Sequence, residues 1–124
     1  MNIIKRAQIE KVSLPGRVAQ TAAGKNGLSK SDKMTVGFGH FGIECGHAEP
    51  HIHAEEMCYI VSAKDSWISY GSSKDNLERK TMLESGMLVH IAQNEWHCFD
   101  FKDDGHVDLV FFYAQVDNIR PEEK

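Results

Sequence analysis

The sequence has too few cysteines, spaced too far apart, to build a covalent or thiolate-clamped scaffold. Its three cysteines are Cys45, Cys58 and Cys98, and no two of them have CxxC spacing. An odd number also argues against a complete disulfide framework. Cys58 and Cys98 lie within apolar runs, where a free thiol packs as a small hydrophobic group. We therefore expect reduced, structural cysteines rather than a disulfide-stapled fold or a catalytic thiol.

Positive charge and long hydrophobic runs are also scarce. Fourteen basic residues stand against eighteen acidic ones, for a formal net charge of −4. This balance disfavours nucleic acid as a partner, because affinity for the phosphate backbone comes largely from Lys and Arg. No run approaches the roughly 18 apolar residues of a membrane span, and the first residues lack the apolar core of a secretory signal. We expect no nucleic-acid or membrane partner, and a cytoplasmic location.

The length and composition are those of one ordinary globular domain. The chain has 124 residues, of which 41% are hydrophobic and 26% are charged, close to average values for folded proteins. A chain of this size buries roughly two-thirds of its unfolded surface on folding. We therefore expect a single domain that spans residues 1–124.

Helical periodicity is absent, and short β-rich segments occur instead. Runs of β-branched and aromatic residues alternate with Gly, Asn, Asp and Ser, which favour turns. The predicted strands span residues 17–21, 34–43, 51–53, 57–62, 66–70, 78–83, 87–91, 96–101 and 107–116. Residues 63–65 and 103–105 are predicted to be chain reversals. So many short strands predict an all-β sandwich or barrel.

The last predicted strand indicates a covered outer surface. From Val110 to Ala114 this strand is apolar on both faces, a pattern typical of strands that are buried on both sides. Either a second sheet or a partner subunit would cover the outer face. We expect a homodimer, because a chain of this length has few other elements to spare.

The most informative segment contains two histidines one residue apart. His51 and His53 are followed by Glu55, Glu56 and the apolar run 57–61. In a strand, residues i and i+2 point to the same face, so the two imidazoles would lie side by side. A carboxylate just downstream can complete a metal site. This pattern predicts a chelating face.

Together with a later segment, this pair resembles the two signature motifs of the cupin superfamily. The first motif covers about residues 46–63, and the second, about 86–101, has a glycine-led strand, a turn and another histidine. The resemblance implies a single cupin-type double-stranded β-helix, or jelly-roll barrel, that binds a divalent metal through three His and one Glu. The matching ligand positions are His51, His53, Glu56 and His97.

The chain departs from the motifs at several positions, of which two bear on the metal site and its turn. The link from His53 to Glu56 is one residue shorter than usual, so Glu55 remains an alternative ligand. Glu56 is preferred because it lies seven residues before Ala63, where the family usually has a glycine after the strand. Asn94 stands where the second motif has its turn glycine, and asparagine tolerates left-handed backbone geometry better than most residues.

The types of ligand limit which metal ions and which reactions are plausible. Imidazole and carboxylate suit Fe, Mn, Co, Ni, Cu or Zn as divalent ions, and the lack of a thiolate argues against a closed structural zinc. Three neutral imidazoles and one carboxylate would leave a net charge of +1 and two open octahedral positions. We expect a metal-dependent enzyme, oxygenase-like or isomerase-like, that acts on a small polar or anionic molecule. The alternative is a non-catalytic module that binds a sugar or a carboxylate.

Other residues near the motifs are weaker candidates. His47 and His90 lie close enough in sequence to orient a ligand or transfer a proton. His47 is expected in a solvated loop, and His90 either turns inward or is exposed at an interface. His97, Phe99 and Phe101 share one strand face, which predicts aromatic walls beside the metal.

Overall fold

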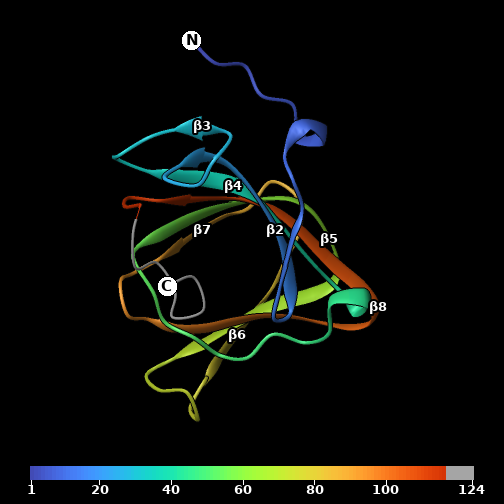
Figure 1. Ribbon diagram of the computed structural model, residues 1–124. Helices are drawn as coiled ribbons and strands as arrows, with labels where there is room; N and C mark the ends of the chain where they lie inside the picture. The colour runs from blue at the N-terminus through green and yellow to red at the C-terminus, as the bar shows by residue number, and fades with distance from the viewer. Residues whose placement is uncertain (117–124) are drawn as a thin grey trace.

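Strands make up nearly all the regular structure of the computed structural model, which describes residues 1–116 (Figure 1). The strands are β1 (Val12–Leu14), β2 (Arg17–Gly24), β3 (Ser29–Lys30), β4 (Thr35–Gly42), β5 (Glu56–Gly71), β6 (Arg79–Met82), β7 (Leu88–Ile91) and β8 (Trp96–Tyr113). Two short 3-10 turns are η1 (Arg6–Gln8) and η2 (Ile43–Cys45). The prediction of an all-β barrel is confirmed. No helix within residues 1–116 has the length and apolar character of a membrane span.

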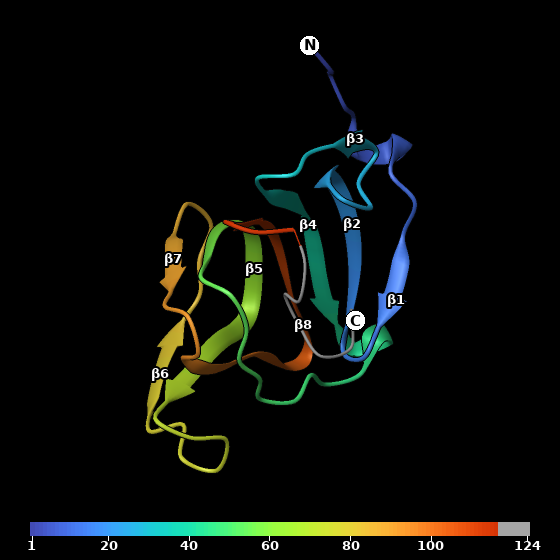
Figure 2. The same cartoon turned by 60° about the vertical axis from the view of Figure 1, so that its left-hand side comes forward.

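Two long strands, β5 and β8, form the frame of the barrel. They pair antiparallel from Glu56 opposite Tyr113 to Gly71 opposite Trp96, with register shifts between Ile60 and Ser62 and between Lys64 and Ser66. The remaining strands extend this ribbon in the order β1-β2-β4-β8-β5-β6. Strand β7 pairs with the first half of β5 and β6 with its second half. Figure 2 shows the ribbon curving so that its two halves face each other around a common interior.

The two predicted chain reversals at 63–65 and 103–105 are wrong. Both segments lie within continuous strands, and Asp65 and Asp103 adopt positive φ angles of 43° and 55°. The pairing register of β5 with β8 shifts between Lys64 and Ser66. The Asp residues, which also favour turns, therefore form bulges at matching places, and a bulge bends a strand without ending it.

Other boundaries differ because pairing, rather than local sequence, sets them. Strands β1 and β3 were not predicted, and β8 ends at Tyr113 rather than at residue 116. The predicted strand 51–53 is reduced to an isolated bridge between His51 and His97. The ladder stops there because the chain turns beside it, where the Asn94 N–H donates to the carbonyl of His53.

The interior is filled by inward-facing residues of the two curved halves. Side chains that are less than 4% exposed include Phe41, Cys58, Ile60, Phe99, Phe101, Val107 and Leu109. Burial along β5 and β8 alternates, as expected when one face of each strand meets the core. The expectation that β8 is covered on both faces is not met within one chain, because Phe111 is 8% exposed but Phe112 is 41% exposed.

Candidate metal centre

Three histidines meet at one end of the barrel. His97 is the second residue of β8, and its backbone exchanges two hydrogen bonds with His51. His53 follows in the segment that leads into β5. One potential ligand atom from each histidine lies within 4.8 Å of the other two. His53 and His97 are buried and His51 is half-buried, so the group faces the interior of the barrel.

In all three imidazole rings, Nδ1 contacts a backbone carbonyl group. The contacts are His51 Nδ1 to Glu49 O at 3.0 Å, His53 Nδ1 to Ala54 O at 2.6 Å and His97 Nδ1 to Glu95 O at 2.7 Å. A carbonyl oxygen only accepts hydrogen bonds, so each Nδ1 carries a hydrogen and donates it. Each neutral ring then has its lone pair on Nε2. Metal-binding histidines typically have this arrangement.

The spacing of two nitrogen atoms fits a metal. Nε2 of His53 and Nε2 of His97 are 3.1 Å apart. Two neutral rings with protonated Nδ1 atoms would present two acceptors to each other there, which is unfavourable unless a cation lies beside them. Ligand nitrogens about 2.1 Å from an ion, at angles between a right angle and the tetrahedral value, are roughly 3.0–3.4 Å apart. The donor set and its geometry therefore fit a divalent ion.

The two candidate carboxylates point in opposite directions. The Glu56 side chain is 4% exposed, and its Oε1 lies 3.3 Å from His53 Nε2. The Glu55 side chain is 57% exposed and lies 2.6 Å from His90 Nε2. Consecutive residues at the start of a strand face opposite sides, which explains the difference. The group of mutually close ligand atoms contains the three histidines and not Glu56.

His47 and His90 lie outside the three-histidine group. His90 is on the outer face of β7, where it pairs with Glu55. His47 is exposed, contacts the Asp100 carboxylate at 2.6 Å, and stacks on the Phe101 ring with 4.5 Å between the centroids. His47 is therefore exposed as expected, and His90 takes the exposed one of its two predicted orientations.

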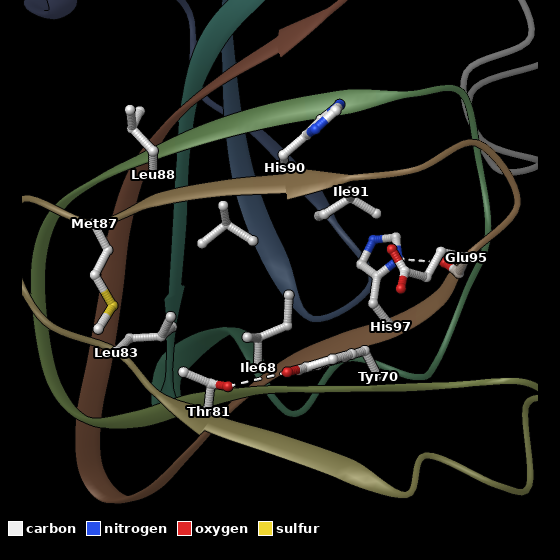
Figure 3. Close-up of a pocket in the computed structure, with 11 residues that line it drawn as sticks. Ile68, Tyr70, Thr81, Leu83, Met87, Leu88, His90, Ile91, Glu95 and His97 are labelled. Atoms are coloured by element: carbon white, nitrogen blue, oxygen red, sulfur yellow. Dashed lines mark hydrogen bonds between the residues drawn. The ribbon is translucent and has the colours of Figure 1, made fainter.

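A cavity of about 390 Å³ opens beside His97, between β6 and β7. Figure 3 shows its residues, with the His97 ring and the Glu95 side chain at one end. Phe99 and Phe101 are part of the buried core, and the cavity wall is mainly aliphatic. The predicted aromatic wall is confirmed for Phe99, which lies edge-on to His97 with 6.5 Å between the ring centroids, and Tyr113 lies in the same way against His53 at 5.1 Å. Phe101 stacks on His47 instead.

Three polar residues of this cavity were not predicted as site residues. Tyr70, Thr81 and Glu95 line it together with His97. Tyr70 and Thr81 fall within predicted strands. Strand alternation places Tyr70 on the same face as Ile68, and this was the feature of the sequence that could have identified Tyr70 as an inward-facing residue. Recognising them also required knowing that β6 lies next to β5, which the sequence does not specify.

A second group of possible metal ligands lies on the outside of the barrel, made of His40, Glu44 and Cys45. His40 uses both ring nitrogens within the protein, since Nδ1 contacts Asp108 at 3.1 Å and Nε2 contacts Glu44. Partial burial, followed by the negative charge of Glu44, raises the pKa of the Cys45 thiol. The thiol is therefore protonated near neutral pH, and the thiolate is the form that binds metals. This group is explained as a surface hydrogen-bond network.

Comparison with known proteins supports the fold but no close relationship. No protein-family profile and no curated protein matches the sequence. The polyketide cyclase RemF from Streptomyces resistomycificus has a TM-score of 0.74 and 15% identity, over 97% of this chain and 84% of that chain. A protein from Planctomyces limnophilus has a TM-score of 0.71 and 16% identity, over 94% and 91%. Fe(II)-HppE, solved with an alternative substrate, has a TM-score of 0.65 and 10% identity, over 91% and 60%. At these identities the similarity concerns the fold alone.

Proposed function

The chain has the fold of the cupin superfamily, and from this fold we propose that it is a metal-dependent enzyme that acts on a small organic molecule. The metal is divalent and is held by His51, His53 and His97. The observation that carries this proposal is the common orientation of the three rings, whose Nδ1 atoms all donate to backbone carbonyl groups. That orientation leaves the Nε2 atom of each ring for a metal, and one ligand atom of each histidine lies within 4.8 Å of the other two.

Glu56 is proposed as the fourth ligand. Its carboxylate is buried and lies 3.3 Å from His53 Nε2, whereas Glu55 is exposed and paired with His90. A buried carboxylate needs a compensating positive charge, and a divalent ion at the three histidines would supply it. The one-residue shortening after His53 is thus compatible with Glu56 as the ligand.

The cavity residues favour an enzyme over a passive binding module. A bound divalent ion would polarise a carbonyl or enol oxygen, or activate dioxygen. Proton transfer needs a separate group within reach of the substrate. Glu95 supplies a carboxylate at the His97 end of the cavity, and its Oε1 is positioned by a 3.2 Å hydrogen bond from the Ala92 N–H. We assign Glu95 as the group that accepts or returns a proton, in an isomerase-like or oxygenase-like reaction.

Metal analysis of the full chain, purified without chelators or oxygen, tests this function. We expect about one divalent ion per chain, removed by EDTA and restored by added metal. Glu56→Gln removes a charged ligand and should weaken metal affinity by about tenfold or more, whereas Glu55→Gln should change it by less than about twofold. Isothermal titration with Mn²⁺ or Zn²⁺ measures the metal affinity of both variants. The reverse order would assign the carboxylate role to Glu55, and a wild-type chain without metal would contradict the proposed function.

The outer face of the barrel supports the expected homodimer. Tyr59, Val61, Leu88 and Phe112 form an apolar outer patch on β5, β7 and β8, and each is between 41% and 68% exposed. Tyr59 pairs directly with Leu88 across the two strands, so these residues are contiguous. A contiguous apolar surface of this kind is typical of an interaction site. We propose that a second copy of the chain covers it, since a two-fold symmetric dimer is the commonest solution for such a surface.

Phe112→Lys should convert this dimer into a monomer, because a lysine at a two-fold interface places charge in an apolar contact from both subunits. Light scattering coupled to gel filtration should give a wild-type mass twice the 14.0 kDa of one chain and a variant mass near that of one chain. Leu28→Lys is the control, because Leu28 is also exposed, at 55%, but lies outside the outer patch. A wild-type monomer would contradict the proposed dimer.

A further inference from the structure

The cavity beside His97 exists because two consecutive strands pair with different parts of β5. Strand β6 pairs with Trp67–Tyr70 and β7 pairs with Glu56–Tyr59, so the two strands separate where they face the interior. Side chains from both strands and from β5 and β8 line the space between them (Figure 3). The cavity measures about 390 Å³, within the size range of small-molecule sites. His97 is the one proposed metal ligand among the described lining residues, so a ligand bound in the cavity lies beside the metal centre at that end.

The walls of the cavity are mostly aliphatic. The apolar lining residues on the interior side are Ile68, Leu83, Met87, Val89 and Ile91. These side chains form no hydrogen bonds, so they stabilise a bound ligand only through contact with its apolar parts. A ligand such as a sugar or a short dicarboxylate would lose hydration along these walls without replacement. The walls therefore favour a ligand with an apolar body.

The charge of the lining limits the charge of the ligand. None of the described residues that line the cavity is Lys or Arg. The acidic side chain is Glu95, and the exposed His90 at the rim is already paired with Glu55. The positive charge for an anionic ligand would come from the proposed metal, which three neutral imidazoles and one carboxylate leave at +1. The Glu95 carboxylate adds negative charge at the same end of the cavity, so the site tolerates at most one negative charge on the ligand, and a phosphate or a polycarboxylate would be left with unpaired charge.

A pair of hydroxyl groups provides a second polar contact away from the metal centre. The Tyr70 hydroxyl lies 3.3 Å from Thr81 Oγ1, and either group can donate to the other. Figure 3 shows this pair on the β5–β6 side, among Ile68 and Leu83 and separated from Glu95. Since each hydroxyl has both donor and acceptor capacity, the pair can bind one hydroxyl or carbonyl oxygen of a ligand.

We propose that the cavity binds a monoanionic molecule with an aromatic or branched apolar body, whose acidic oxygen group reaches the metal while Tyr70 and Thr81 bind a second oxygen. This inference rests on the proposed metal centre, and it replaces the sugar-like or multiply charged ligand classes with a hydrophobic monocarboxylate, enol or phenol. Tyr70 is the specificity-determining residue, because its hydroxyl distinguishes a ligand with a distal oxygen from one without it.

Four probes of known structure test this proposal on the full chain loaded with Co²⁺. Isothermal titration should show 3-phenylpropanoate binding at least about tenfold more tightly than malonate or inorganic phosphate, because burial of the phenyl ring adds favourable transfer free energy. The hydroxylated analogue 3-(4-hydroxyphenyl)propanoate should bind more tightly again. Tyr70→Phe should lower the affinity for the hydroxylated analogue by roughly three- to tenfold, the usual effect of one lost hydrogen bond. The same variant should change the affinity for 3-phenylpropanoate by less than about twofold.

A cavity-filling variant separates the proposal from the metal centre. Val89→Phe places a ring in the space between β6 and β7, and should abolish 3-phenylpropanoate binding while the Co²⁺ stoichiometry stays at one per chain. Met82→Phe is the matched control, since Met82 is 55% exposed and does not line the cavity. Two results would show that the ligand class is wrong while the metal centre stands, provided that Co²⁺ binds. One is a malonate or phosphate affinity equal to that of 3-phenylpropanoate, and the other is a Val89→Phe variant that binds 3-phenylpropanoate with wild-type affinity. If no Co²⁺ binds, the proposed function fails, and the metal-anchored ligand fails with it.

Discussion

Replacing His97 with alanine should reduce the bound divalent metal from one ion per chain to nearly none. His97 supplies one of three converging imidazoles, and its Nε2 lies 3.1 Å from that of His53. Its backbone also holds His51 in place through two hydrogen bonds. Loss of hydrogen-bonding partners around metal ligands costs about 10- to 100-fold in affinity, so loss of a ligand itself should cost more. Mass-spectrometric metal analysis and competition titrations with a chelator measure the change.

His90→Ala is the matched control for that experiment. His90 lies in β7, which pairs with β5, and it is exposed and paired with Glu55, so its removal should leave metal content unchanged. Circular dichroism of both variants should show the wild-type strand signal, which separates metal loss from unfolding. Full metal content in a folded His97→Ala protein would contradict the proposed ligand set.

Phe99→Ala should cause the largest loss of stability that a single core substitution produces in this chain. Phe99 is 2% exposed, pairs across the ribbon with Ile68, and packs on Phe41 with 5.2 Å between the ring centroids. Truncation removes a buried ring and leaves a cavity that a close-packed core fills only in part, at a cost of about 3–5 kcal/mol. Urea denaturation of the metal-free protein gives the free energy of unfolding without a contribution from the metal.

Met82→Ala is the comparison, because Met82 is also apolar but is 55% exposed. Its loss should change the free energy of unfolding by less than about 1 kcal/mol, the usual range for surface substitutions. If the two variants were equally stable, the barrel interior would not be packed around Phe99 as described.

The histidines were predictable because their positions depend on a motif and on local chain geometry. His51, His53 and His97 occupy the positions that the two motifs indicate, and the structure brings them together. The choice between Glu55 and Glu56 was harder, because adjacent residues in a strand differ only in the face they occupy. Their burial follows from where β5 begins, a boundary that the sequence alone left uncertain by a residue.

The fold class was predictable and the strand boundaries were less so. Asp65, Asp103 and Gly105 are residues that favour turns, and local sequence does not distinguish a reversal from a bulge. The difference lies in the partner strand. A Cβ atom at Gly105 would lie 2.6 Å from the carbonyl oxygens of Lys64 and Asp65, so this glycine permits the close approach of the two bulged strands.

The bend in the β5–β8 ribbon has a thermodynamic consequence. Glu56 pairs with Tyr113 at one end of the ribbon, and His97 pairs with Tyr70 near the other end. His53 contacts both ends, since its Nε2 is 3.3 Å from Glu56 and 3.1 Å from His97. A metal at this point cross-links the two ends of the folded ribbon, and the unfolded chain cannot form the same site. Folding and metal binding are then linked equilibria, in which each tenfold rise in free metal above its Kd adds about 1.4 kcal/mol to the free energy of unfolding.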